Sequence, residues 1–202
     1  YWFSRAFMPV MPLAGLIHIT RDAQVRDVLN RPDDFPVAFG REMAELGGGA
    51  TFMLGLDGAE HDRLNRVMAG LIRREDADWM ADKSGAFAAA LLDGGKGRID
   101  VVQDVIKRVP AEIALRFFGL RCDDVDGFAD WTIALSAMLF GDPYGKPAVR
   151  AVAVNAAQRL GAVIDAALVR ARQRAAAGRL QDDTLLARLV LAQGAHGLTD
   201  AE

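Results

Sequence analysis

The sequence is poor in the residues that hold disulfide-rich and metal-centred proteins together. It has one cysteine, Cys122, and three histidines, His18, His61 and His196, among 202 residues. A single cysteine excludes an intrachain disulfide framework, so we expect a cytoplasmic protein in a reducing compartment. The histidines are too far apart to predict a metal site. Glycine-rich phosphate loops, H-E-x-x-H and C-x-x-C motifs are absent from the sequence.

A strong charge of one sign and a long hydrophobic run are also missing. The formal net charge is -3, which gives no electrostatic reason to expect nucleic acid or an anionic membrane as a partner. No apolar run approaches the roughly 20 residues that a membrane-spanning helix needs, so we predict no membrane span. Hydrophobic residues make up 51% of the chain, which is enough for a sizeable core.

The two ends of the sequence look like internal segments of a protein. Tyr1 opens the chain in place of methionine, and the closing "GLTDAE" resembles the start of a helix with Thr199 as its N-cap. We therefore expect a piece of a longer protein.

Hydrophobic periodicity predicts a mainly α-helical protein with one small strand. Leu16–Thr20 alternates and is rich in β-branched residues, and Thr20 is expected to cap the next helix. Asp100 is expected to cap a helix that Pro110 kinks and Gly119 ends. The predicted helices occupy residues 21–29, 57–72, 75–95, 100–118, 123–143, 147–180 and 181–193.

Residues 33–56 break this regularity, although they are rich in apolar side chains. Pro36 and Gly47-Gly48-Gly49 interrupt the segment, so the sequence predicts a long irregular loop. Such a loop either folds over a hydrophobic core or forms one wall of a ligand pocket.

The helix at 57–72 carries polar side chains at the border of its apolar stripe. Asp57 and Glu60 have the spacing of a capping box. His61 and Asn65 lie one turn apart beside the stripe, whereas Arg63 and Arg66 point away from it. A border histidine on its own is usually a packed, hydrogen-bonded residue. The stripe consists of Leu64, Val67, Met68, Leu71 and Ile72.

The order of these segments resembles the N-terminal half of a cytochrome P-450, a haem-thiolate monooxygenase, of the soluble bacterial kind. The motif D-x-x-E-H-x-R-L-x-R at residues 57–66 is similar to the family's C helix. The segments "IDVV…VPAEIALRFFGL", "DDVDGFADW", 147–180 and "DDTLLARLVLA…GLTDAE" resemble its E, F, G and H helices and the start of the I helix. The resemblance implies a mainly α fold, helices B to H with a small β element. Residues 1–202 would then be the incomplete N-terminal portion of one domain, with 33–56 as its substrate-facing B–C loop.

The resemblance also implies a haem site. In the family, a histidine and the arginine four residues after it hold a haem propionate. His61 matches, but Asn65 stands where the family has arginine, and an amide cannot neutralise a propionate. Arg66 is the neighbouring cation, so the implied cofactor-binding residues are His61, Asn65 and Arg66. The cysteine that ligates the haem iron, and every catalytic residue, are expected downstream of Glu202.

The family's activity would be hydroxylation of a hydrophobic small molecule, with O2 and electrons from a ferredoxin or flavoprotein reductase. The fragment alone would be inactive. The implied substrate-binding residues are Phe39, Met43, Phe52, Met53, Leu54, Met138, Leu139, Phe140 and Tyr144. Each of these apolar residues also fits ordinary core packing.

Cys122 is not the expected iron ligand. The stretch "FFGLRCDD" looks like the family's F-x-x-G-x-R-x-C-x-G loop, but the cysteine position falls on Asp123. We interpret Cys122 as a residue of a helix–helix turn.

Two other functions fit the same pattern. One keeps the haem-thiolate fold and isomerises fatty-acid hydroperoxides without a redox partner. The other is a non-catalytic, all-helical ligand-binding domain. A family cysteine loop downstream would favour the haem enzymes over the binding domain.

Overall fold

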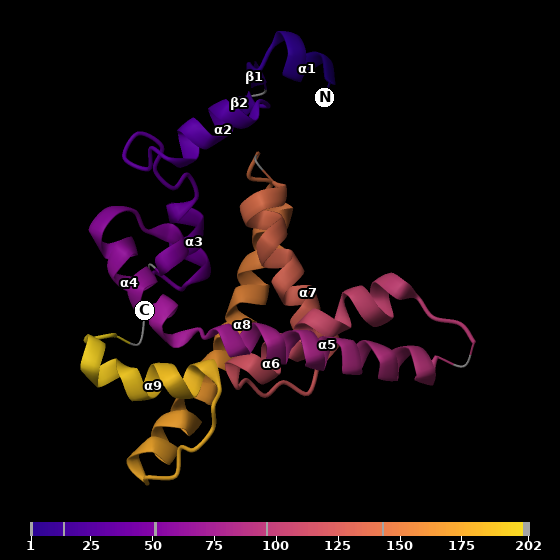
Figure 1. The fold of residues 1–202 in the computed structure, drawn as a ribbon, viewed down its shortest axis with the longest axis vertical. Helices are drawn as coiled ribbons and strands as arrows, with labels where there is room; N and C mark the ends of the chain where they lie inside the picture. The colour runs from indigo at the N-terminus through magenta and orange to yellow at the C-terminus, as the bar shows by residue number, and fades with distance from the viewer. Residues whose placement is uncertain (1, 14, 51, 96, 143, 200–202) are drawn as a thin grey trace.

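The computed structural model describes residues 2–13, 15–50, 52–95, 97–142 and 144–199, and over these residues the chain is mainly α-helical, as predicted. Figure 1 shows a small N-terminal group and a larger helical body. The N-terminal elements are α1 (Trp2–Phe7), β1 (Val10–Leu13), β2 (Leu16–Ile19) and α2 (Asp22–Leu29). The body contains α3 (Gly40–Leu46), the 3-10 turn η1 (Met53–Gly55), α4 (Gly58–Leu71), α5 (Arg74–Gly94), the π turn η2 (Val101–Ile106), α6 (Arg108–Phe118), α7 (Val125–Ser136), the π turn η3 (Ala137–Gly141), α8 (Pro147–Ala176) and α9 (Leu185–His196).

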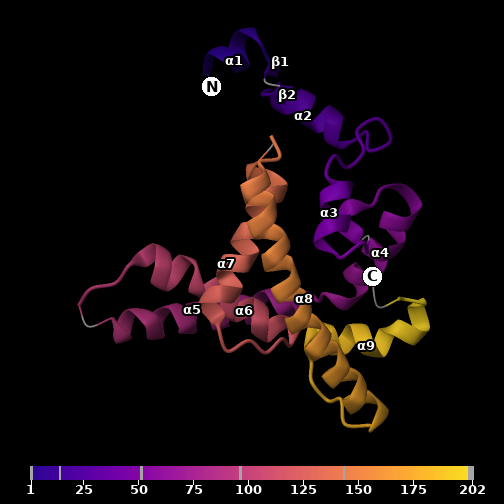
Figure 2. The same cartoon turned by 180° about the vertical axis from the view of Figure 1, so that it is seen from behind.

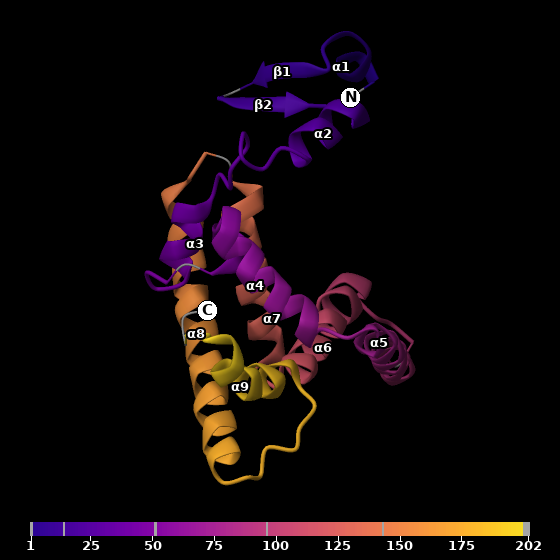
Figure 3. The same cartoon turned by 60° about the vertical axis from the view of Figure 1, so that its left-hand side comes forward.

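The N-terminal group is built around an antiparallel hairpin of β1 and β2, in which Val10 pairs with Ile19. The predicted strand is confirmed, but the sequence did not indicate its partner. The predicted cap of α2 is wrong, because the Thr20 hydroxyl donates to the Pro9 carbonyl instead. Arg21 occupies the N-cap position of α2, and its side chain donates to the Arg5 carbonyl at 2.9 Å. These elements lie at one end of the molecule, apart from the long helices (Figures 1 and 3).

Helices α7 and α8 form the centre of the body. They pack side by side, as the view from behind also shows (Figure 2), and α9 crosses the lower part of α8. Alanines on the packed face of α8 are buried and let the neighbouring helices approach closely. The compact core lies between α6 and α7, where Ala111, Leu115, Phe128 and Ala129 are in contact. The ring centroids of Trp79 and Phe117 lie 6.3 Å apart and join α5 to α6.

Two predicted helix ends are confirmed, and the predicted kink at Pro110 stays a prediction. The Asp100 carboxylate accepts hydrogen bonds from the amides of Val102 and Gln103, both at 3.0 Å. A π turn follows, and α6 begins separately at Arg108. Pro110 therefore lies in the first turn of α6, where its missing N–H leaves no helical bond unmade. Gly119 ends α6 with φ 78°, a conformation that glycine adopts readily.

Residues 33–56 are more regular than the sequence predicts, because they contain α3 and η1. Met43 of α3 is buried, and a Cβ at Gly55 would approach the Met43 Cβ to 3.0 Å. The short elements α3 and η1, which have no strong helical sequence pattern, therefore pack closely against each other at the Met43 side chain. The 33–56 segment therefore lies beside α4. Its role as a substrate-facing B–C loop stays a prediction.

The predicted capping box at the start of α4 is also wrong. Asp57 occupies the N-cap position, but its carboxylate accepts the Val37 amide at 3.0 and 3.1 Å. Glu60 binds Arg63 at 2.6 Å instead of the N-cap amide. Asp57 therefore ties the start of the 33–56 segment to the start of α4. The predicted helix start near Thr199 runs into residues 200–202, which lie outside the described part of the chain.

The protein exposes more surface than a compact monomer of its mass would. The chain exposes 13,388 Å², whereas a compact monomer of 21.8 kDa would expose about 9,300 Å². Large apolar side chains are exposed in every part of the fold, among them Phe7, Ile17, Leu29, Leu92, Val102, Phe140 and Leu191. Such an excess is typical of a surface that is meant to be covered.

Helix α8 is the one helix among the described residues that is long and apolar enough to cross a membrane by length and composition. The same composition suits a helix packed inside a protein, and α8 contacts α3, α7 and α9. Taken alone, its length and hydropathy are weak evidence for a membrane span.

Candidate functional site

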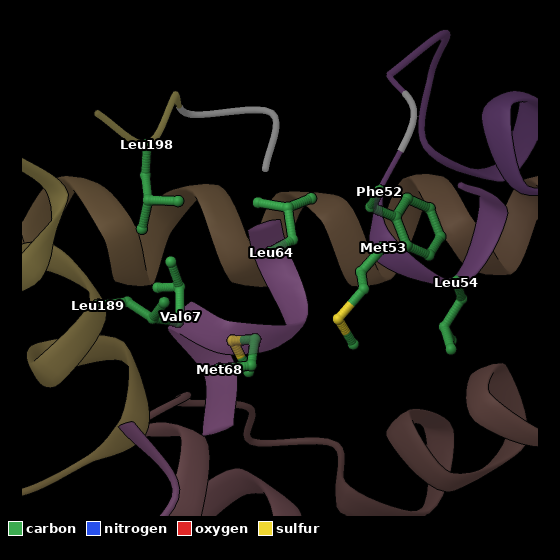
Figure 4. A pocket seen from close by; sticks show the side chains of 8 residues that line it. All are labelled: Phe52, Met53, Leu54, Leu64, Val67, Met68, Leu189 and Leu198. Atoms are coloured by element: carbon green, nitrogen blue, oxygen red, sulfur yellow. The ribbon is translucent and has the colours of Figure 1, made fainter. Parts of the chain in front are cut away.

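An apolar pocket of about 160 Å³ lies between α4, η1 and α9. Figure 4 shows residues 52–54 on one side of it, α4 in the middle, and Leu189 and Leu198 on the other side. Its lining residues are Phe52, Met53, Leu54, Leu64, Val67, Met68, Leu189 and Leu198. The volume is close to that of an apolar protein cavity known to bind benzene, so the pocket can accept a small hydrophobic group.

Part of this lining follows from the sequence and part does not. Phe52, Met53 and Leu54 are candidate substrate-binding residues, and the structure brings them together at the pocket. The apolar stripe of α4 supplies Leu64, whose burial was predicted. Sequence analysis missed Leu189, because nothing in a local pattern reveals that α9 lies against α4.

Among the other candidate substrate residues, the structure brings Phe39 and Phe140 into contact. The rings of Phe39 and Phe140 meet edge to face, with centroids 5.5 Å apart. Close to them, Arg150 of α8 donates to Glu45 of α3 at 2.8 Å. The 33–56 segment and the α7–α8 connection are therefore neighbours, although this cluster lies outside the pocket lining. Met43 and Met138 are buried, Leu139 is half-buried, and Phe140 and Tyr144 are exposed.

The expected haem-propionate residues lie on α4. The His61 side chain is 40% exposed, and its Nδ1 lies 3.2 Å from Asp62 Oδ1. It stands one turn before the pocket residue Leu64 and does not line the pocket itself. Asn65 and Arg66 are exposed. The three side chains thus share one helix, and none of them lines the pocket.

Arg63, another cation of α4, forms an ion pair within the same helix. Arg63 binds both oxygens of Glu60, with a shortest distance of 2.6 Å. This hydrogen bond lowers the pKa of the Glu60 carboxyl, because it favours the ionised form.

The most buried ionic group joins α4, α5 and α9, and sequence analysis missed it. Arg188 of α9 donates to Asp76 of α5 through both terminal nitrogens, at 2.6 and 2.8 Å. Asp76 is 7% exposed, and the Arg73 amide also donates to it at 2.7 Å. The Arg188 hydrogen bonds lower the pKa of Asp76 to about 2, against the opposing effect of burial. No local pattern connects two residues that lie 112 positions apart.

The described residues contain no group of three histidine, cysteine or acidic side chains able to hold a metal ion. Cys122 is half-buried at the turn between α6 and α7, and its thiol donates to the Asp124 carbonyl at 3.2 Å. It packs against the core of Ala111, Leu115, Phe128 and Ala129. This placement agrees with its interpretation as a turn residue.

Comparison with known proteins gives a similarity of fold. No family model matches the sequence, and no curated protein matches it either. Among solved structures, the chain is similar to the crystal structure of CalO2, with a TM-score of 0.73 and 21% sequence identity. The similarity covers 100% of this chain and 51% of the CalO2 chain, so this chain spans about half the length of that structure. At this level of identity the similarity establishes a shared fold.

Proposed function

We propose that this chain is the N-terminal portion of a haem-thiolate monooxygenase of the cytochrome P-450 type, acting on a hydrophobic small molecule. The observation that carries the proposal is the apolar pocket beside the helix of His61. One of its walls comes from residues 52–54, the end of the segment that resembles the substrate-facing B–C loop. The order of segments from Leu16 to Thr199 supports the same family.

The excess surface supports the proposal that the chain is half of a domain. The chain exposes about 4,000 Å² more than a compact monomer of its mass. A standard protein–protein interface buries only about 800 Å² on each partner. An excess several times larger favours burial against further residues of the same domain, as in a core that is shared by two halves. The coverage of about half of the CalO2 chain fits this interpretation.

The residues present fit one edge of a haem. The partly exposed His61 ring can donate a hydrogen bond to a carboxylate, and the Asn65 amide adds donors without charge. Arg63 is engaged by Glu60. No iron ligand comes from the described residues, so the thiolate belongs to residues downstream of Glu202 in this proposal. Bound haem would supply the iron that activates oxygen.

The roles left to this chain are binding and orientation. His61 would hold a propionate, and Asn65 would hold it more weakly than the arginine of the family. Phe52, Met53 and Leu54 would exclude water from one side of the substrate. Electrons would come from a ferredoxin or flavoprotein reductase.

The test is the absorption spectrum of the natural protein that contains these residues. We expect the reduced, carbon-monoxide-bound form to show the Soret band of a thiolate-ligated haem. His61→Ala should lower the retention of haem during gel filtration, because one propionate loses its donor, whereas His18→Ala should not. A protein that binds apolar ligands but no haem would contradict the proposal and favour the ligand-binding domain.

A further inference from the structure

The buried ionic group around Arg188 uses every donor of the guanidinium. Nε and Nη2 donate to the Asp183 carboxylate and carbonyl at 2.9 and 3.2 Å, and Nη1 donates to the Leu71 carbonyl at 2.9 Å. The two bonds to Asp76 complete the five donors that an arginine possesses. Because the guanidinium is planar and rigid, five simultaneous bonds fix its position and orientation.

These bonds hold together two helices, α4 and α9, that both line the pocket. Leu71 is the last residue of α4, one turn after the pocket residues Val67 and Met68. Leu189, the next residue after Arg188 in α9, also lines the pocket. Arg188 therefore hydrogen-bonds α9 to the C-terminal end of α4, and the pocket lies next to this contact.

We propose that the Asp76–Arg188 pair is a positioning device for the pocket. It fixes α9 against the end of α4, and so sets the distance of Leu189 from Val67 and Met68. Both residues are positioning residues, since neither lines the pocket. The inference deepens the proposed function, on which it rests for the pocket's role as the site of an apolar ligand.

Geometry separates this role from simple stabilisation. Burying two charges costs desolvation energy that their attraction often only balances, so an apolar pair of similar volume can stabilise a fold equally well. An apolar pair cannot reproduce the five directed bonds. If the pair sets the pocket, its apolar replacement keeps the protein folded and loses the pocket's shape.

The experiment measures benzene binding to the natural protein that contains these residues, by methyl NMR of Val67, Met68 and Leu189. The variants are Arg188→Lys, which keeps the charge but not the planar fork, and the double variant Asp76→Leu with Arg188→Met. We expect the dissociation constant for benzene to rise by about tenfold in both, a loss of about 1.4 kcal/mol of binding free energy, because Leu189 would lose close contact with the ligand. The midpoint of thermal unfolding of the double variant should stay close to that of the parent.

The control is the exposed pair of Arg174, in the last turn of α8, with Asp182, in the connection between α8 and α9. The corresponding double variant, Arg174→Met with Asp182→Leu, should leave both the benzene affinity and the methyl shifts unchanged. Unchanged benzene affinity in the two Arg188 variants would overturn the inference, as would a parent protein that binds no benzene. Failure of both Arg188 variants to fold would make the pair a stabilising element only, which also overturns it. A protein without haem that gives the expected shifts would contradict the proposed function and leave this inference standing.

Discussion

Residues 5–35 and the helices α5 to α9 differ in how their apolar side chains are covered. In the N-terminal region the large apolar residues Phe7, Ile17 and Leu29 are exposed, and Leu29 is 74% exposed. In the helical body Phe128 is 4% exposed inside the core between α6 and α7. Both regions have regular backbone hydrogen bonding. The difference shows that regular secondary structure forms in both regions, whereas the large apolar side chains of residues 5–35 have no buried core of their own.

Removing a core side chain should show the largest difference between the two regions. Phe128→Ala leaves a cavity in the core of α6 and α7 and should lower the free energy of unfolding by about 3–5 kcal/mol. Leu29→Ala should change it by less than about 0.5 kcal/mol in the 202-residue chain, since an exposed side chain loses little burial. Urea unfolding followed by circular dichroism measures both.

The same Leu29→Ala variant can break this comparison. In the longer protein that we propose, we expect it to cost about 1–3 kcal/mol, because the side chain would be buried there. An equal, small cost in both chains would contradict the proposal that further residues cover the N-terminal region.

The two regions also differ in how deeply their ion pairs are buried. Asp76→Ala removes the buried carboxylate partner of Arg188 and leaves it only the exposed Asp183 carboxylate; breaking a buried pair typically costs about 3–5 kcal/mol. Asp22 pairs with Arg26 at 2.8 Å, but both side chains are largely exposed. Asp22→Ala should therefore cost less than about 1 kcal/mol. Comparable losses in urea unfolding would show that the Asp76 pair is not specially buried in solution.

Acid should lower the free energy of unfolding of the helical body by protonating the Asp76 carboxylate. Asp76 has a pKa of about 2 in the folded protein, against about 3.9 in the unfolded chain. The pair's contribution is complete above about pH 4 and is lost as the pH falls from there toward 2, because the unfolded state then binds the proton first. The free energy of unfolding should fall less steeply over this interval in Asp76→Asn than in the parent. Identical slopes would assign acid sensitivity to other groups.

The contrast between the regions also explains how much the sequence could predict. The α8 helix starts at Pro147 as its periodicity and its N-terminal proline indicate, because these signals are local. Phe52, Met53 and Leu54 were recognisable as candidates from their apolar character within an irregular segment. The bond of Arg188 to Asp76 and the position of Leu189 were not, since both depend on the packing of helices distant in the sequence. The role of His61 in holding a haem propionate stays a prediction, because the position of its ring alone does not identify the group that it binds.

The capping box of α4 failed for a related reason. Asp57 had two possible donors, the amides of the first turn of α4 and the Val37 amide, and only the fold decides between them. Its hydrogen bond to Val37 contributes a net stabilisation of about 1 kcal/mol. Asp57→Ala should accelerate hydrogen exchange at the Val37 amide severalfold and trypsin cleavage at Arg41, while Asp33→Ala should change neither. Faster exchange at Glu60 instead would mean that the carboxylate caps the helix in solution, as its sequence pattern predicts.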